Sequence, residues 1–303
     1  MSTLTDSQIS LLSSSSSGIL SRLLCHPLDT LKSRLQSPTT PSRTFLLSLT
    51  SLLSTHGPSG LYRGLPASLI GGTPGTILYL QSYDLTKSHL TSSTPFPPSL
   101  IHLTSGIIAE IISCIIYVPV DVTKERLQIS TLSNEKLYKG SFDCLKKIIE
   151  NEGIKGIYKG YGGTVASFGP FSGMYFLGYE KLKSTVRENN YYSSGVSKPA
   201  IGDVELTFNE TLTCSLTAGA VASWVTTPLD LAKLRMQVSN SKLMDKDMKE
   251  KYRTFGRSLK SIFRDEGVRG LWRGGMARVA FFTPATGITM GTYDWFKGIL
   301  KDM

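Results

Sequence analysis

Hydrophobic residues along this chain gather in long segments that polar and small residues interrupt. The most apolar stretches are Ile101–Val118 and Thr211–Thr227, which contain Gly, Ser and Thr, and the first also contains Glu110. No run of 18 apolar residues is uninterrupted, so a simple search for membrane spans would pass over the chain. Small residues favour close helix packing in lipid, and polar residues are tolerated where they face a water-filled interior.

A ten-residue motif occurs three times, which predicts a repeat architecture. Its Pro, Asp, Lys, Arg and Gln are the same in every copy, and no copy has an insertion. The copies are Pro27-Leu-Asp29-Thr-Leu-Lys32-Ser-Arg34-Leu-Gln36, Pro119-Val-Asp121-Val-Thr-Lys124-Glu-Arg126-Leu-Gln128 and Pro228-Leu-Asp230-Leu-Ala-Lys233-Leu-Arg235-Met-Gln237.

Two further motifs follow each copy, and the spacing between these two is constant. The first has glycines seven residues apart, and the second begins nineteen residues after the closing glycine. The glycine motifs are Gly57-Pro-Ser-Gly-Leu-Tyr62-Arg63-Gly64, Gly153-Ile-Lys-Gly-Ile-Tyr158-Lys159-Gly160 and Gly267-Val-Arg-Gly-Leu-Trp272-Arg273-Gly274. The last motifs are Tyr83-Asp84-Leu-Thr-Lys87, Tyr179-Glu180-Lys-Leu-Lys183 and Tyr293-Asp294-Trp-Phe-Lys297.

These motifs divide the chain into three modules, residues 1–95, 96–195 and 196–303. Between the first two motifs of each module lies a variable segment, at 37–56, 132–152 or 239–266. We expect each of these segments to form a loop and a short amphipathic helix. Each module is then a helix, a short helix and a second helix, which gives six membrane spans.

The motifs resemble the signature of the mitochondrial carrier family, P-x-[DE]-x-x-[KR]-x-[KR] followed by [DE]-G-x4-[aromatic]-[KR]-G, over essentially the whole chain. His56 departs from it, because it stands where an acidic residue is usual. The resemblance implies an all-α membrane protein with six transmembrane helices, three short matrix helices and threefold pseudosymmetry. It also implies a monomeric solute antiporter of the mitochondrial inner membrane, without enzymatic activity or any cofactor except structural cardiolipin.

The first motifs predict a set of ion pairs that we call the matrix network. Pro27, Pro119 and Pro228 should bend three helices so that they converge. Asp and Lys three residues apart share one helical face, and three equal sets argue against ordinary surface pairs of little energy. We predict the pairs Asp29–Lys124, Asp121–Lys233 and Asp230–Lys32, and the resemblance adds Gln36, Gln128 and Gln237 as braces.

The last motifs predict a second set, which we call the cytosolic network. Its predicted pairs are Asp84–Lys183, Glu180–Lys297 and Asp294–Lys87, with Tyr83, Tyr179 and Tyr293 as braces. Two networks that are not closed at once would give alternating access, with the substrate biasing the equilibrium between two states.

The glycine motifs resemble the cardiolipin sites of the family. A glycine at a helix N-terminus exposes backbone N–H groups to a lipid phosphate, and a basic side chain adds charge; the alternative is that these glycines only form turns. The candidate lipid-binding residues are Gly57, Arg63, Gly64, Gly153, Lys159, Gly160, Gly267, Arg273 and Gly274.

Family contact points for substrate lie 13 and 12 residues before the acidic residue of each cytosolic motif. Here all six are uncharged, although three charged residues lie nearby in the helices, and Glu110 is open to a functional or a structural interpretation. The candidate substrate-binding residues are Arg22, Gly71, Gly72, Glu110, Ser167, Phe168, Arg278, Phe281 and Phe282.

This set favours a zwitterionic, amino-acid-like substrate or an adenosyl-amino-acid over a dicarboxylate, a tricarboxylate or phosphate. The segments 109–128 and 160–180 also resemble the branch near the S-adenosylmethionine carriers. The alternatives are a nucleotide or cofactor carrier, a metal-cation carrier, and a membrane adaptor with a carrier fold but no transport.

The remaining composition changes this interpretation little. A net charge of +10 suits nucleic acid, anionic lipid or an anionic substrate, but no nucleic-acid-binding signature occurs, so we expect no nucleic-acid partner. The four cysteines, Cys25, Cys114, Cys144 and Cys214, show no metal-ligand spacing. We therefore expect reduced thiols and no metal site.

Overall fold

The computed structural model describes residues 6–40, 44–133, 137–194 and 207–301, and the regular structure in these ranges is helical. The predicted boundary between the second and third modules, at residue 195, lies outside them. The helices are α1 (Asp6–Gln36), α2 (Phe45–His56), η1 (Pro58–Tyr62), α3 (Leu65–Ser93), α4 (Pro98–Ser130), α5 (Ser141–Glu152), α6 (Ile154–Ile157), α7 (Tyr161–Ser194), α8 (Phe208–Val225), α9 (Thr227–Val238), α10 (Lys246–Lys251), α11 (Phe255–Leu271) and α12 (Gly275–Lys301).

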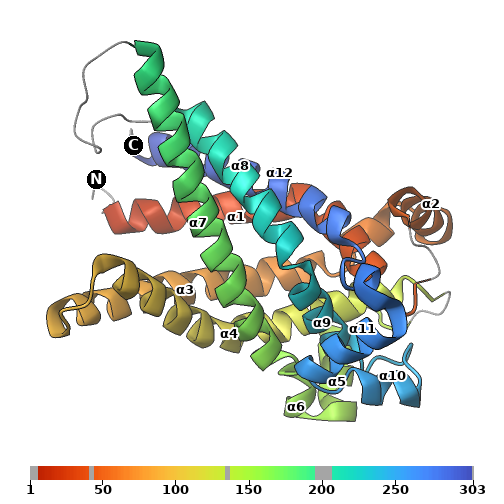
Figure 1. Ribbon diagram of the computed structural model, residues 1–303. Helices are drawn as coiled ribbons and strands as arrows, with labels where there is room; N and C mark the ends of the chain where they lie inside the picture. Colours follow the sequence, from red (N-terminus) through yellow and green to blue (C-terminus); the bar gives the residue numbers. More distant parts are fainter. Residues whose placement is uncertain (1–5, 41–43, 134–136, 195–206, 302–303) are drawn as a thin grey trace.

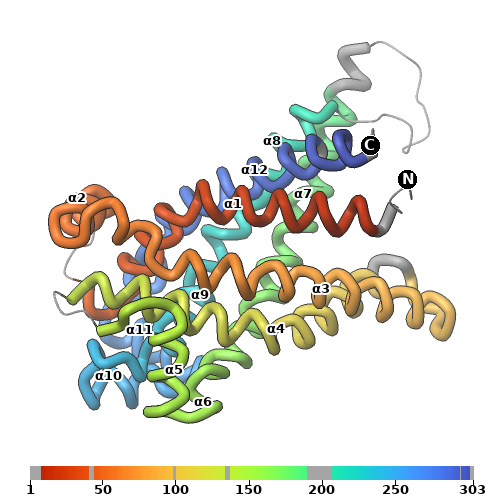
Figure 2. Tube along the Cα trace, turned by 180° about the vertical axis from the view of Figure 1, so that it is seen from behind, coloured from red at the N-terminus to blue at the C-terminus, as the bar shows by residue number. Residues whose placement is uncertain are grey.

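Three helix pairs form a ring that narrows towards one end. In Figure 1 the long helices converge where the short helices α5, α6, α10 and α11 gather, and they spread apart towards the start of α1 and the end of α12. Seen from behind, α2 lies at the same converging end (Figure 2). The order around the ring is α1, α3, α4, α7, α8 with α9, and α12, which packs back on α1.

The three proline positions differ in how far they interrupt the helix. α1 continues through Pro27 and α4 through Pro119. In the third repeat the chain breaks into α8 and α9, and Pro228 lies in the first turn of α9. Pro is well tolerated in a first turn, because the N–H that it lacks has no helical partner there. Only the third of these helices is therefore fully divided at its proline.

One helix, over Leu100–Ser130, is long and apolar enough to meet a length-and-hydropathy criterion for a membrane span in the described residues. Polar side chains on the other long helices account for this result. Ser13 and Ser17 of α1, for example, are fully buried against neighbouring helices, as expected where small residues mediate helix packing in lipid.

The paired glycines of each module are required by the backbone. In the described residues, positive φ angles occur only at six glycines, at 66–69° for the first of each pair and 74–94° for the second. A side chain is strained in this region, whereas glycine is not. The first glycine ends α2 or α5, or interrupts α11 at Gly267, and the second precedes α3, α7 or α12. This explains the constant spacing of seven.

The expected short helices are present as α2, α5 and α11, but the prediction that all three are amphipathic is wrong for α2. That helix buries Ser48 and Leu52 while Leu46 and Leu47 are exposed. Its residues before His56 carry no charge. An amphipathic helix has apolar residues on its buried face and polar residues on its exposed face, but α2 has a serine inside and leucines outside. Its outer face therefore suits contact with lipid.

Buried arginines join each repeat to the next at the converging end. Arg126 donates from Nε to the carbonyl of Gln237 at 3.3 Å, and Arg235 donates in the same way to Gln36 at 3.3 Å. Arg34 donates from Nη1 to the carbonyl of Thr131 at 2.7 Å. The three contacts run around the ring in one direction, so the repeats form a closed circle.

Two of these arginines also anchor the short helices. Arg126 donates to the Glu152 carboxylate from its two terminal guanidinium nitrogens, Nη1 and Nη2. The longer contact, from Nη2 to Oε2, is 2.9 Å. Arg235 forms the equivalent ion pair with Glu266. Both arginine side chains are almost fully buried. Burial opposes ionisation of Glu152, but the hydrogen bonds and charge of Arg126 outweigh it and lower the pKa of the carboxyl group.

We predict that Glu152→Gln lowers stability by about 3 kcal/mol, because it leaves the buried charge of Arg126 uncompensated. The pKa of Glu152 is lowered on folding, so the stabilisation is present at neutral pH and is lost as the pH falls through the folded-state value. Thermal unfolding of the detergent-solubilised protein at pH 7 measures the loss. Glu150→Gln, on the exposed face of the same helix, is the control; equal melting temperatures for the two variants would contradict the prediction.

Candidate substrate site and gating networks

The three predicted pairs of the matrix network lie within ion-pair distance. Lys32 Nζ is 2.8 Å from Asp230 Oδ2, and Lys233 Nζ is 2.8 Å from Asp121 Oδ2. Lys124 Nζ is 3.2 Å from Asp29 Oδ2. Each pair joins helices of two different repeats, and its side chains are mostly buried. The ring of pairs therefore holds the converging end closed.

Two of the three predicted glutamine braces are formed. Gln128 donates to Asp29 Oδ2 at 3.0 Å, and Gln36 donates to Asp230 Oδ2 at 3.3 Å. The prediction that Gln237 forms the third brace is wrong for this conformation. Its amide is buried without a hydrogen-bond partner among the described residues. The side chain lies instead against Gly160, where the absence of a Cβ leaves room for it.

Arg278 joins the matrix network, although the sequence places it among the candidate substrate-binding residues. Its Nε lies 3.4 Å from Asp230 Oδ2, and Nη1 donates to the carbonyl of Ser223 at 2.8 Å. The guanidinium also lies over the rings of Phe171 and Phe282, 5.7 and 5.3 Å from their centroids. With 4% of its surface exposed, Arg278 supports the closed network in this conformation and does not face the cavity described next.

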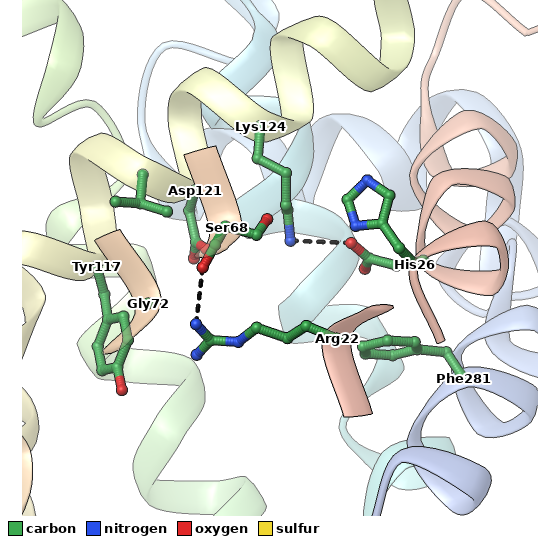
Figure 3. A pocket seen from close by; sticks show the side chains of 10 residues that line it. Arg22, His26, Ser68, Gly72, Tyr117, Asp121, Lys124 and Phe281 are labelled. Carbon is green, nitrogen blue, oxygen red and sulfur yellow. Dashed lines mark hydrogen bonds and ion pairs between the residues drawn. The ribbon is translucent and has the colours of Figure 1, made fainter. Parts of the chain in front are cut away.

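A cavity of about 150 Å³ lies directly above the matrix network. Figure 3 shows Arg22 extending across it, with Tyr117 on one side and Phe281 on the other. Arg22 Nη1 donates to the carbonyl of Ser68 at 2.7 Å. Asp121 and Lys124 of the network form part of its lining. The floor of the cavity is therefore made by the groups that close the protein.

Glycines on α3 create the space that Arg22 and α4 occupy. A Cβ at Gly72 would lie 1.1 Å from Arg22 Nη1, so no side chain is compatible with this position of the arginine. At Gly71 a Cβ would lie 2.0 Å from Val120 Cγ2. Gly72 is thus a cavity residue, whereas Gly71 serves the close packing of α3 against α4.

The remaining candidate residues divide between aromatic packing and the helix interior. Phe282 packs on Phe171 at a centroid distance of 5.4 Å, and Phe168 packs edge-on to Tyr79 at 6.4 Å. Ser167 donates to the carbonyl of Gly163 at 2.7 Å, within its own helix. Three of the nine candidates therefore line the cavity, namely Arg22, Gly72 and Phe281.

Glu110 is buried within the membrane-spanning part of α4, with 9% of its surface exposed. Cys114 Sγ lies 3.5 Å from its Oε1 and is its hydrogen-bond donor. Among the described residues, no Lys, Arg or His nitrogen lies within 4.0 Å of its carboxylate. The structural alternative, a pair with a basic neighbour, is therefore not seen in this conformation.

The cytosolic network is not paired in this conformation. In the part of it that the structure describes, neither Asp84 nor Glu180 lies within ion-pair distance of a lysine; the side chain of Asp294 lies outside that part. Lys183 and Lys297 lie instead over Tyr179 and Tyr293, 5.5 and 5.6 Å from the ring centroids.

A second cavity, of about 640 Å³, opens beside this network. It lies between α1, α3 and α12, and Asp84 and Tyr293 form part of its wall. This cavity and the unpaired acids both lie at the end away from the matrix network.

The basic residues of the glycine motifs bind the neighbouring repeat. Arg63 Nη2 donates to the carbonyl of Tyr138 at 2.6 Å, and Lys159 Nζ donates to Asn240 Oδ1 at 2.5 Å. Arg273 completes the circle by donating to the carbonyls of Leu35 and Thr40, at 3.1 and 3.0 Å. Their cationic ends therefore point into the protein. A lipid phosphate that bound these basic groups would compete with the hydrogen bonds between repeats.

The comparison with protein families agrees with this geometry. The family described as mitochondrial carrier protein matches residues 5–94, 97–190 and 204–303, one repeat after another. The chain belongs to the mitochondrial carrier family. This carrier is thus a multi-pass transporter of the mitochondrial inner membrane and not an enzyme.

Relatives along its full length carry different names. The carrier is 33% identical to mitochondrial substrate carrier family protein E of Dictyostelium discoideum, over 97% of this chain and 96% of the relative. It is 30% identical to the mitochondrial S-adenosylmethionine carrier protein of Xenopus laevis, over 96% and 97% of the two chains. It is also 29% identical to mitoferrin of Dictyostelium discoideum, over 97% and 94%.

Several residues of the cavity wall carried no signal in the repeat pattern. His26, Ser68, Tyr117 and Val120 line the cavity, but the equivalent positions in the other repeats hold different residue types. Tyr117 and Thr76 share a hydrogen bond of 2.9 Å between their hydroxyl groups. Asymmetric residues such as these can give the carrier its specificity, because a threefold pattern describes only the residues that the repeats share.

We predict that Lys124→Met destabilises the carrier more than the double variant Asp29→Asn with Lys124→Met. The single change leaves the buried Asp29 carboxylate without its cation, at a cost of about 3 kcal/mol, whereas the double change removes both charges. Thermal unfolding in detergent measures both. If the double variant is the less stable of the two, the pair does not carry the stabilising charge interaction assigned to it.

Proposed function

We propose that this carrier transports a zwitterionic, amino-acid-like metabolite by alternating access, and that the structure represents the state open to the cytosol. The observation that carries the proposal is the contrast between the two ends. The matrix network has all three of its pairs within 3.2 Å, whereas Asp84 and Glu180 of the cytosolic network are exposed and unpaired among the described residues. The end with the short helices then faces the matrix.

The cavity lies where a bound substrate can act on the closed end. Asp121 and Lys124 belong both to its lining and to the matrix network. A substrate charge placed there competes with the ion pairs and lowers the energy needed to separate them. Since a ligand shifts an equilibrium only through a difference in affinity between two states, this shared wall supplies the required difference.

The charges near the cavity favour a substrate with an acidic and a basic group. Arg22 offers its remaining N–H donors to a carboxylate, and the buried Glu110 is available for a cationic group after a small rearrangement of α4. Phe281 and Tyr117 add aromatic surface for an apolar or planar part of the ligand. S-adenosylmethionine has all three features, and a relative at 30% identity is named as its carrier.

A nucleotide or cofactor carrier is the second candidate. Three aromatic side chains, Phe171, Phe281 and Phe282, pack together beside Arg278, and such a group suits a nucleobase next to a phosphate. This requires Arg278 to leave Asp230. A non-transporting adaptor is disfavoured because the matrix network is complete in its acidic and basic residues.

We also infer a structural role for cardiolipin and a monomeric carrier. The glycines at 64, 160 and 274 precede α3, α7 and α12 and have positive φ angles. Backbone N–H groups at the start of these helices can bind a lipid phosphate without the help of the basic residues, whose side chains are engaged between repeats.

A thermal-shift screen of the purified carrier tests the substrate class. We expect S-adenosylmethionine or a related zwitterion to raise the melting temperature, since a ligand that binds only the folded state stabilises it by mass action. The shift should be lost in Arg22→Ala and reduced in Glu110→Gln. Uptake into proteoliposomes then confirms transport. A shift with nucleotides alone would favour the second candidate, and no shift with any compound would favour the adaptor.

We further predict that Gly72→Ala reproduces the effect of Arg22→Ala on substrate affinity. The added Cβ lies where Arg22 Nη1 stands, so the guanidinium must leave the carbonyl of Ser68. The displaced guanidinium then loses one charge-assisted hydrogen bond to the substrate, and the substrate binds about tenfold more weakly. Initial uptake rates give the KM of each variant. Gly162→Ala is the control, because a Cβ there meets nothing within 4 Å; an unchanged KM in Gly72→Ala would contradict the assignment of Arg22.

A further inference from the structure

The first repeat differs from the other two at one ion pair of the matrix end. Arg126 and Arg235 pair with Glu152 and Glu266. The same positions of the first repeat hold Arg34 and His56. Two basic residues therefore stand where the other repeats have a base and an acid.

His56 occupies the same place as the two glutamates. A Cβ built on Gly60 would lie 2.8 Å from the Cβ of His56. The equivalent distances are 2.5 Å from Gly156 to Glu152 and 2.2 Å from Gly270 to Glu266. In all three repeats this Cβ therefore has nearly the same position relative to the glycine four residues later. The repeats differ in the side chain and not in the position of the helix.

Arg34 is buried without an acidic partner. Only 3% of its surface is exposed. Its Nη1 donates to the carbonyl and hydroxyl of Thr131, at 2.7 and 2.6 Å, and its Nε donates to Ser48 Oγ at 3.4 Å. Within the described ranges, no carboxylate lies within 4.0 Å of it. A buried guanidinium without a counter-ion is costly, so this position favours an anion.

His56 and Arg63 complete a cationic group around the same place. His56 Nδ1 is buried and has no hydrogen-bond partner in the described part of the chain. Burial and the positive charges of Arg63 and Arg34 lower the pKa of His56, as expected where cationic groups lie near one another. Arg63 uses Nη2 to bind the carbonyl of Tyr138. In the described part of the first repeat, no carboxylate lies within ion-pair distance of Arg34 or Arg63.

The third repeat shows what such a group binds. There the carboxylate of Glu266 lies between Arg235 and Arg273, with Oε2 3.3 Å from Arg273 Nη1. Arg34 and Arg63 are the equivalents of these two arginines. The place between them thus corresponds to the position of a carboxylate that the chain itself supplies elsewhere.

The geometry points to an oxyanion-binding site in the first repeat, at which a phosphate group binds Arg34, His56 and Arg63 and takes the place of the missing glutamate. Its oxygens accept hydrogen bonds from the two guanidinium groups and from His56 Nδ1–H. The bound anion links α1 to α2 as the glutamates link the other repeats, and it makes the stability of the matrix end respond to phosphate. This site is separate from the substrate cavity and independent of the proposed substrate.

Thermal unfolding of the detergent-solubilised carrier, in sulfate or chloride at equal ionic strength, tests the site. Sulfate serves as a phosphate analogue whose charge is constant with pH. We expect millimolar sulfate to raise the melting temperature of the wild-type protein by about 2 °C. The increase should be larger at pH 6 than at pH 8, because a protonated His56 binds the anion more strongly.

His56→Glu is the matched variant, since it restores the acid of the other repeats. It should melt at a higher temperature than the wild-type protein in chloride and should not respond to sulfate. General effects of sulfate on protein hydration act on both proteins alike and cancel in the comparison. Equal sulfate responses of the two proteins would overturn the proposal.

Two further experiments extend the test. The first identifies the source of the phosphate, and the second recreates the site in another repeat. If added cardiolipin raises the melting temperature of the wild-type protein, but not of His56→Glu, and removes the sulfate response, then a lipid phosphate is the occupant. If cardiolipin acts equally on both, a free phosphate is the occupant. Glu266→His reproduces the first-repeat arrangement in the third repeat, where Arg235 and Arg273 are the equivalents of Arg34 and Arg63, and should show an additional recovery by sulfate; its absence in a folded variant would also count against the site.

Discussion

The ring of three aspartate–lysine pairs is the interaction on which the rest of this carrier depends. Each pair joins two different repeats at distances of 2.8–3.2 Å, and Asp29, Asp121 and Lys124 of the ring also line the cavity. Desolvation weakens the net contribution of such pairs, which suits a closure that opens in the transport cycle proposed above. The same ring thus closes one end, shapes the site and limits the energy that the substrate has to supply.

Permanent links surround this reversible ring. The arginines at 34, 126 and 235 and the basic residues at 63, 159 and 273 bind backbone or amide groups of the next repeat. Links of this kind join neighbouring repeats independently of the ring, so they would keep the repeats in register in the proposed cycle. The first repeat lacks the acid that completes its set, and a phosphate at His56 would make this one link conditional on the surroundings.

Features shared by the three repeats could be predicted from the sequence, and the asymmetric ones could not. The six helices, the three short helices and the partner of each lysine in the matrix network follow from motifs that all three repeats share. Three other features depend on neighbours that only one repeat has. They are the contact between Arg278 and Asp230, the Gln237 amide without a hydrogen-bond partner among the described residues, and the apolar outer face of α2. Tyr117 and Arg22 meet across the cavity for the same reason, because glycines of α3 leave space that no motif describes.

The circular order of the inter-repeat contacts has a consequence for biogenesis. Arg273, close to the end of the chain, donates to the carbonyls of Leu35 and Thr40 near its beginning. During synthesis the first repeat therefore waits for the last before its own carbonyl groups are satisfied. A chain that lacks the third repeat also lacks the donor for these two carbonyl groups, so its circle of contacts between repeats cannot close.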